Sequence, residues 1–113
     1  GTGEAKREFM HVDDAADAIL FYLENKIDSS FINVGWGIDI PIKELAEKIA
    51  AIAGYKGDLL WDSSKPNGMM RKCMNVSRMK DSGFTPKIIL DDGIKMLIDE
   101  YKQKVHQKAG DNK

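Results

Sequence analysis

The sequence predicts a small α+β domain of about three helices with short strands, and three observations lead to this class. Apolar residues recur at helical spacing in separate stretches, and short β-rich runs lie between them. These runs are too short and too scattered to build a doubly wound parallel sheet. The chain has 113 residues, 42% of them apolar, which is enough for one domain with a modest core.

The first half of the chain reads as strand, helix, strand. Residues 8–12 (EFMHV) are β-rich, and Asp13 or Asp14 is placed to cap a helix that runs to about Asn25. The run SSFINVGW, residues 29–36, predicts a buried strand that turns at two glycines. The apolar positions of the first helix are Ala15, Ala18, Ile19, Tyr22 and Leu23.

The second half holds the clearest helix, from Pro41 at its first turn to Gly54 as its stop. Residues 57–62 (GDLLWD) predict a short strand, and residues 63–75 form a long irregular connection. Ser77 is placed to cap a short helical turn, and a last helix is expected from about Leu90 to Val105. We therefore expect a domain over residues 1–105 and a polar tail over residues 106–113. The face of the helix after Pro41 is marked by Ile42, Leu45, Ala46, Ile49, Ala50 and Ala53.

Charge and composition narrow the possible functions. Seventeen basic and 18 acidic residues give a formal charge of −1, which argues against broad attraction to nucleic acid or a membrane surface. One cysteine permits no internal disulfide and favours a reducing, cytoplasmic location. No apolar run is long enough for a membrane span or a signal segment. The chain begins with Gly1, so we expect it to be a piece of a longer protein or a processed product.

The run REFMHVDD contains the first candidate ligand-binding group. In a strand over residues 8–12, alternate side chains share a face, so Arg7, Phe9 and His11 should point the same way. The planar guanidinium of Arg7 suits a phosphate or a carboxylate. The alternative is that Arg7 pairs with an aspartate of the domain and that His11 is a partly buried packing residue, which by residue type is the commoner situation.

The irregular connection supplies further cations, Lys65, Arg71 and Lys72. A loop without regular structure leaves such charges free to face a ligand, and with Arg7 they would surround a diphosphate. A solvated run of charges is an equally good interpretation. Cys73 follows Lys72, which would lower a thiol pKa, but a small buried apolar residue is the better interpretation. Trp36 and Trp61 suit base stacking or core packing.

Several motifs are absent from the sequence. No glycine-rich phosphate loop joins a strand to a helix, no metal-binding spacing such as CxxC or HExxH occurs, and no nucleophile elbow is found. We therefore expect no metal site within these residues.

The order of the motifs is more specific than any one of them. The strings GTGEAKREFMHVDDAADA, FINVGWG, IKELAEKIAAIAGYKG and WDSSKPNGMMRKCMNVSRM, followed by Gly83 and Phe84 before the last helix, resemble the C-terminal part of the GDP-L-fucose synthase family. These are extended short-chain dehydrogenases/reductases, which epimerise a GDP-4-keto-6-deoxymannose at two carbons and reduce it with NADPH. The resemblance covers residues 1 to 105.

The resemblance implies site residues. It places Arg7 and Lys72 on the nucleotide-sugar diphosphate, Asn67 near the substrate, and Arg71 in support of the loop; Lys65 belongs to the same predicted substrate-binding set. The family usually has aspartate at the position of Asn67, a threonine-proline pair at Met69 and Met70, and aspartate at the position of Asn75. These departures leave open a looser loop and a different sugar.

The resemblance also implies what lies outside the chain. The cofactor turn and the catalytic tyrosine and lysine belong upstream of Gly1, so NADP(H) is the expected cofactor of the parent protein and this fragment alone should neither bind it nor catalyse. The expected partners are a GDP-sugar, an N-terminal Rossmann domain and, in the parent, a second copy in a homodimer. Two alternatives stay open: another nucleotide-sugar reductase or epimerase acting on a different GDP-hexose or GDP-heptose, and a non-catalytic binding module.

Overall fold

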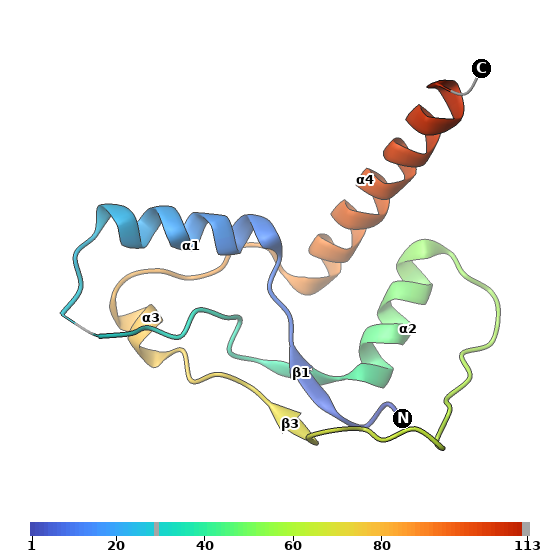
Figure 1. Cartoon of the computed structure of the whole chain (residues 1–113), viewed down its shortest axis with the longest axis horizontal. Coiled ribbons are helices and arrows are strands. Elements are labelled where there is room, and N and C mark those ends of the chain that lie inside the picture. The colour runs from blue at the N-terminus through green and yellow to red at the C-terminus, as the bar shows by residue number, and fades with distance from the viewer. Residues whose placement is uncertain (29, 112–113) are drawn as a thin grey trace.

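The computed structural model describes residues 1–28 and 30–111, which form four helices and a three-stranded sheet (Figure 1). The α+β class predicted from the sequence is confirmed. Helix α3 lies within the short helical turn expected over residues 76–83, but its N-cap residue is Val76 and not Ser77 as predicted. The elements in chain order are β1 (Lys6–Glu8), α1 (Val12–Glu24), β2 (Asp39–Pro41), α2 (Ile42–Ala53), β3 (Arg71–Lys72), α3 (Ser77–Asp81) and α4 (Leu90–Asp111).

The sheet is small and mixed, with β1 in its centre. The strand order is β2-β1-β3, and β1 is antiparallel to β2 and parallel to β3. Arg7 lies opposite Ile40 on one side and opposite Lys72 on the other. Since β2 runs directly into α2 and β3 follows the long loop, β1 connects the two halves of the chain.

The apolar core lies between α1, α3 and the segment that follows α3. Its buried members are Ala18, Val76, Met79 and Phe84, of which Met79 is fully enclosed. The Tyr22 hydroxyl and the Ser82 hydroxyl, 2.8 Å apart, join α1 to the end of α3 by a hydrogen bond. Partly buried residues pack around this cluster, namely Met10, Phe21, Tyr22, Ile32 and Val34.

A buried carboxylate fixes the last connection to α1. Asp14 is 1% exposed, and its two oxygens accept hydrogen bonds from the backbone amides of Lys87 and Ile88 at 3.0 and 2.9 Å. A buried charge is stable only when it is hydrogen-bonded, and both donors are present here. Asp14 therefore holds the segment that leads into α4 against the first turn of α1.

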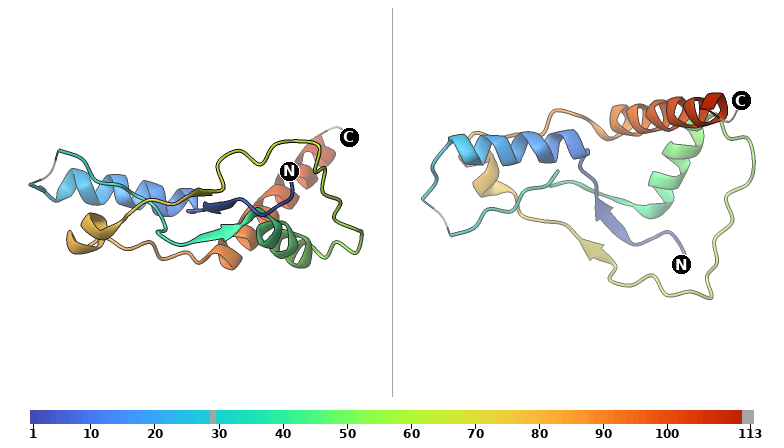
Figure 2. Two further views of the ribbon diagram at one scale, coloured as in Figure 1. Left: turned by 90° about the horizontal axis from the view of Figure 1, so that it is seen from below. Right: turned by 45° about the horizontal axis from the view of Figure 1, so that its top comes forward.

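Helices α2 and α4 pack against each other away from that core (Figure 2). The Lys48 ammonium and the Asp91 carboxylate form an ion pair of 3.1 Å between them. The predicted ends of α2 are confirmed: Pro41 is the N-cap residue, and Gly54 adopts a left-handed conformation with φ of 72° at the C-cap. Helix α4 begins at Leu90 as predicted but continues to Asp111 rather than ending at Val105.

Three sequence predictions about strands are wrong, and the cause is the same in each case. The first strand is Lys6–Glu8 rather than residues 8–12, because its partners β2 and β3 pair only there. Residues 30–36 and 57–62 form no strand among the described residues, since no second segment pairs with them; Ser29 lies outside the described part. A β-rich run becomes a strand only when another backbone satisfies its hydrogen bonds.

The molecule is flat and open. Its principal extents are 51, 42 and 19 Å, and the radius of gyration is 17.6 Å (Figure 2), whereas a compact chain of this length has about 13 Å. Large apolar side chains are correspondingly exposed on α1 and before the long loop, including Ile19, Leu23 and Leu60. The predicted apolar face of α1 is thus only partly covered by the described residues.

Candidate anion-binding site

Arg7 and Lys72 are neighbours in the sheet although they are far apart in the sequence. They are register partners in the parallel pair β1–β3. Register partners project their side chains to the same face of a sheet, so both cations leave the same side. Lys72 is exposed and Arg7 is half-buried. The two cations with the strongest sequence case as anion ligands therefore lie side by side.

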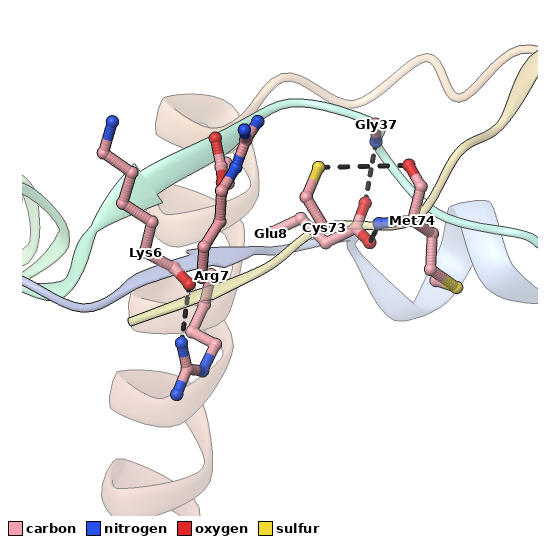
Figure 3. Close-up of polar contacts among 8 residues, drawn as sticks. Lys6, Arg7, Glu8, Gly37, Cys73 and Met74 are labelled. Carbon is pink, nitrogen blue, oxygen red and sulfur yellow. Dashed lines mark hydrogen bonds and ion pairs between the residues drawn. The ribbon is translucent and has the colours of Figure 1, made fainter. Parts of the chain in front are cut away.

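The Arg7 guanidinium is held close to its own backbone and to the loop. Its Nη1 donates a hydrogen bond to the Lys6 carbonyl oxygen at 2.7 Å. Figure 3 shows the side chains of Lys6 and Arg7 leaving β1 in opposite directions. A Cβ atom at Gly68 would lie 3.7 Å from the Arg7 Nη2 atom, so the glycine backbone of the loop lies next to the guanidinium. Gly68 has a φ of 72°, a conformation that favours glycine.

Arg71 lies on the other face and is committed to an ion pair. Its Nε donates to the Asp39 Oδ2 at 2.6 Å, which joins β3 to β2 across β1. The hydrogen bond and the charge of Arg71 hold the pKa of the Asp39 carboxyl below its usual value. The same contact raises the pKa of Arg71, which stays charged. Arg71 is thus tied to Asp39 within the sheet, and its role in support of the loop stays a prediction.

Asn67 and Lys65 lie in the long loop that precedes β3. The Asn67 Oδ1 accepts a hydrogen bond from the Thr2 amide at 2.7 Å, and the Asn67 Nδ2 donates to the Thr2 Oγ1 at 2.9 Å. The Lys65 amide donates a hydrogen bond to the Asp62 carbonyl oxygen at 3.3 Å, which closes a turn. Among the described residues, no hydrogen bond or ion pair joins the Lys65 side chain to Arg7 or Lys72.

Glu8 is a functional candidate that the sequence analysis missed. Its Oε2 accepts from the Gly37 amide and its Oε1 from the Met74 amide, both at 2.7 Å (Figure 3). One carboxylate thus connects the segment before β2 to the segment after β3. Its position could have drawn attention to it, because Glu8 stands between Arg7 and an aromatic residue in the predicted strand. Successive side chains of a strand point to opposite faces, so Glu8 is directed away from the face of Arg7.

Other candidates predicted from the sequence make contacts within the fold. The His11 Nδ1 accepts from the Asp13 amide at 3.0 Å, so His11 rather than an aspartate caps α1, and it does not continue the strand face of Arg7. Trp61 packs beside Gly3, where an added Cβ would lie 2.9 Å from its ring. Burial raises the pKa of the Cys73 thiol, and the charges of Glu8 and Asp39 raise it further. Cys73 is half-buried, so the interpretation of it as a buried apolar residue is met only in part.

The prominent cavities of the described residues, of roughly 250 to 530 Å³, are lined by side chains other than Arg7 and Lys72.

Within residues 1–28 and 30–111, no three His, Cys, Asp or Glu side chains are grouped to hold a metal ion. No helix of the described residues is both long and apolar enough to cross a bilayer.

Sequence comparison links the chain to known enzymes. Residues 1–35 match the NAD dependent epimerase/dehydratase family. The chain is 44% identical over 108 residues to a putative GDP-L-fucose synthase 2 of Arabidopsis thaliana, covering 96% of the chain and 33% of that protein. It is 43% identical over 103 residues to the GDP-L-fucose synthase of Escherichia coli K12, covering 83% and 32%. The chain thus spans about a third of the length of these relatives.

Structure comparison gives a consistent result. A GDP-6-OMe-4-keto-L-xylo-heptose reductase from Campylobacter jejuni has a TM-score of 0.84 and 38% identity, over 92% of this chain and 33% of that one. The sequence and the fold therefore resemble nucleotide-sugar epimerases and reductases of the extended short-chain dehydrogenase/reductase class. Within that class, the resemblance to GDP-L-fucose synthases predicted from the motifs is confirmed.

Proposed function

We propose that this chain is the GDP-sugar-binding part of an NADP-dependent GDP-L-fucose synthase, which epimerises GDP-4-keto-6-deoxymannose at two carbons and reduces it. The observation that carries the proposal is the register pairing of Arg7 with Lys72. Residues 1–105 are the substrate-binding part in this proposal, and the turns of α4 from residue 106 are a polar extension.

Two adjacent cations on one face of a sheet suit a diphosphate. Arg7 offers a planar set of donors, and Lys72 offers a mobile ammonium on an exposed strand edge. Hydrogen bonds between charged groups are about twice as strong as neutral ones, and excluding water strengthens them further. Asn67 and Lys65, in the loop beside them, complete the proposed substrate-binding set. Arg71 contributes through its ion pair with Asp39, which supports β3.

The proposed role of these residues in the reaction is orientation. By holding the diphosphate, Arg7 and Lys72 fix where the sugar ring lies relative to the acids, bases and hydride donor of the enzyme. Such positioning contributes up to several kcal/mol to lowering a barrier. The chemistry itself belongs to an upstream Rossmann domain that binds NADP(H), so the isolated chain is expected to be inactive.

Further partners follow from the exposed surface. The apolar side chains Ile19, Leu23 and Leu60 would be covered in a larger protein, and the Rossmann domain is the proposed cover. We also propose that the complete enzyme is a cytoplasmic homodimer. The GDP-sugars in the names of the similar enzymes support a nucleotide-diphosphate ligand here as well.

The test is GDP binding by the complete enzyme. Arg7→Ala and Lys72→Ala should each weaken GDP binding by about 1.5 to 3 kcal/mol, the range for hydrogen bonds to charged groups, as measured by isothermal titration calorimetry. Lys102→Ala removes the same charge from an exposed position on α4 and serves as the control. Unchanged affinity in both site variants would refute the assignment.

A second candidate, a reductase acting on a GDP-heptose, is favoured by the likeness to the Campylobacter jejuni enzyme. Met69 and Met70 stand where the family has a threonine-proline pair, and both are exposed in the loop beside the site. Steady-state turnover of GDP-4-keto-6-deoxymannose and of a GDP-4-keto-heptose by the complete enzyme decides between the two. A higher kcat/KM for the heptose would replace the first assignment with the second.

A further inference from the structure

We infer that Glu8 is a positioning residue for the anion site: its carboxylate fixes β3 so that Lys72 stays beside Arg7, and Glu8 itself does not touch the ligand. The inference deepens the function proposed above and depends on it. It starts from an unusual feature of the sheet, which is that its edge strands are extremely short.

Strand β3 has only two residues, and β2 has only three. The register of a strand is normally specified by several ladder bonds and by a buried face, but both residues of β3 are exposed. The ladder with β1 is therefore a weak determinant of where Lys72 lies. A contact outside the ladder is needed to prevent β3 from shifting along β1 or separating from it.

Glu8 supplies that contact. Its two carboxylate oxygens accept from Met74, two residues after Lys72, and from Gly37, two residues before β2, both at 2.7 Å (Figure 3). Each is a charge-assisted hydrogen bond, and a single rigid group makes both. The carboxylate thus continues the pairing of β1 on both sides at the point where the backbone ladder ends.

The space around the carboxylate fits this role. A Cβ atom at Gly35 would lie 2.8 Å from the Glu8 Oε2 atom, so the backbone of the segment before β2 passes close to the carboxylate. In the strand, Glu8 alternates with Arg7 and is directed to the opposite face. It therefore reaches the anion site only through the strand that carries Lys72.

Charge and position predict opposite effects on binding. If Glu8 acted only as a nearby negative charge, it would repel a diphosphate, and Glu8→Gln would strengthen GDP binding. If it positions β3, Glu8→Gln should weaken GDP binding, because the amide group of glutamine cannot accept from both backbone amides. Glu8→Asp keeps the charge but shortens the side chain by one methylene, so it too should weaken binding.

The experiment is a double-mutant cycle on GDP binding, measured by calorimetry on the complete enzyme. We expect Glu8→Gln and Glu8→Asp each to weaken GDP binding by roughly five- to tenfold, less than the direct loss of a hydrogen bond to a charged group, because Glu8 acts on the site only through β3. In a Lys72→Ala background, the same substitutions should change affinity by less than about twofold, because the group that they position is gone. Glu4→Gln, an exposed carboxylate before β1, controls for the loss of charge.

The possible outcomes separate the two proposals. If Lys72→Ala leaves GDP affinity unchanged, the proposed site fails, and the role of Glu8 fails with it. If Lys72→Ala weakens binding but the Glu8 variants have the same effect in both backgrounds, or no effect, only the positioning role is overturned. Thermal melts show whether the Glu8→Gln variant folds. If it does not, the double-mutant cycle is measured with Glu8→Asp alone and is interpreted by the same criterion.

Discussion

Asn67 and Thr2, 65 positions apart in the sequence, exchange two hydrogen bonds. The amide of Thr2 donates to the Asn67 carboxamide oxygen at 2.7 Å, and the Asn67 amide group donates to the Thr2 hydroxyl at 2.9 Å. Since Gly68 lies next to the Arg7 guanidinium, this pair fastens the loop at the residue before that close approach.

Substituting either residue of this pair should destabilise the domain, because each substitution removes the same interaction between them. We expect Asn67→Ala and Thr2→Val to couple by about 0.5 to 1.5 kcal/mol in a double-mutant cycle, the net value of a typical hydrogen bond. Asn67→Asp retains acceptors for both the Thr2 amide and the Thr2 hydroxyl, so it should cost less than the alanine variant. Urea unfolding measures all four free energies, and additivity of Asn67→Ala and Thr2→Val would show that the pair is not coupled.

Among the carboxylates of α1, Asp14 should be the one whose loss lowers the free energy of unfolding most. Asp14→Ala leaves the amides of Lys87 and Ile88 without their acceptor, and an unsatisfied buried donor costs about 1 to 3 kcal/mol. Asp17 lies on the same helix with an exposed side chain, so Asp17→Ala is the matched control. Chemical denaturation that gave equal losses for the two variants would contradict this role of Asp14.

The Arg71–Asp39 ion pair predicts a specific pH dependence of stability. Arg71 holds the pKa of Asp39 below its usual value of 3.8. Because the folded-state pKa is the lower one, the stabilisation is complete above the unfolded-state pKa and is lost as the pH falls through the folded-state pKa. The difference in melting temperature between wild type and Arg71→Gln should therefore be constant from about pH 7 to 5 and shrink below about pH 4.

The control for this pH dependence is Lys72→Gln, which removes the same charge from the next residue of β3. Its difference from wild type should change much less over the acidic range, because Lys72 is not the partner of Asp39. If the Arg71→Gln difference stayed constant down to about pH 2, the ion pair would not be the source of the acid sensitivity.

Cys73 should react slowly with alkylating reagents at neutral pH. Burial and the nearby carboxylates of Glu8 and Asp39 raise its pKa above the usual 9.0, so the thiol form predominates and the nucleophilic thiolate is scarce. The rate of iodoacetamide labelling against pH should have its midpoint above 9.0. Glu8→Gln should move the midpoint down, since it removes one of the carboxylates that oppose ionisation. A midpoint below that of a free thiol would contradict the prediction.

The helices could be predicted from the sequence because their signals are local. Pro41 and Gly54 delimit α2, and apolar residues at helical spacing mark the face between them. The start of α1 was misassigned by two or three residues, because the imidazole of His11 accepts the capping hydrogen bond in place of an aspartate. The side chain that caps a helix depends on a rotamer as well as on residue type.

The strands could not be predicted, because their cause is not local. β2 contains Asp39 and Pro41, β3 consists of two cations, and neither has the composition of a strand. Arg7 and Lys72 were candidate ligands by residue type and by the family resemblance, but their register pairing depends on a backbone 65 residues away. Glu8, Asn67 and Asp14 likewise act on segments distant in sequence, and such contacts leave no pattern in a local window.

The central place of β1 has a consequence for how the chain acquires its fold during synthesis. β1 is the first of the three strands to be made, yet its neighbours on both sides are encoded later, and β3 comes only after the whole of α2 and the long loop. Until β3 is made, the edge of β1 that β2 does not cover has unpaired amides and carbonyls, which are prone to pair with other chains. The nascent polypeptide is therefore sensitive to aggregation for a time. This period ends once Met74 has been made and its amide can bind Glu8.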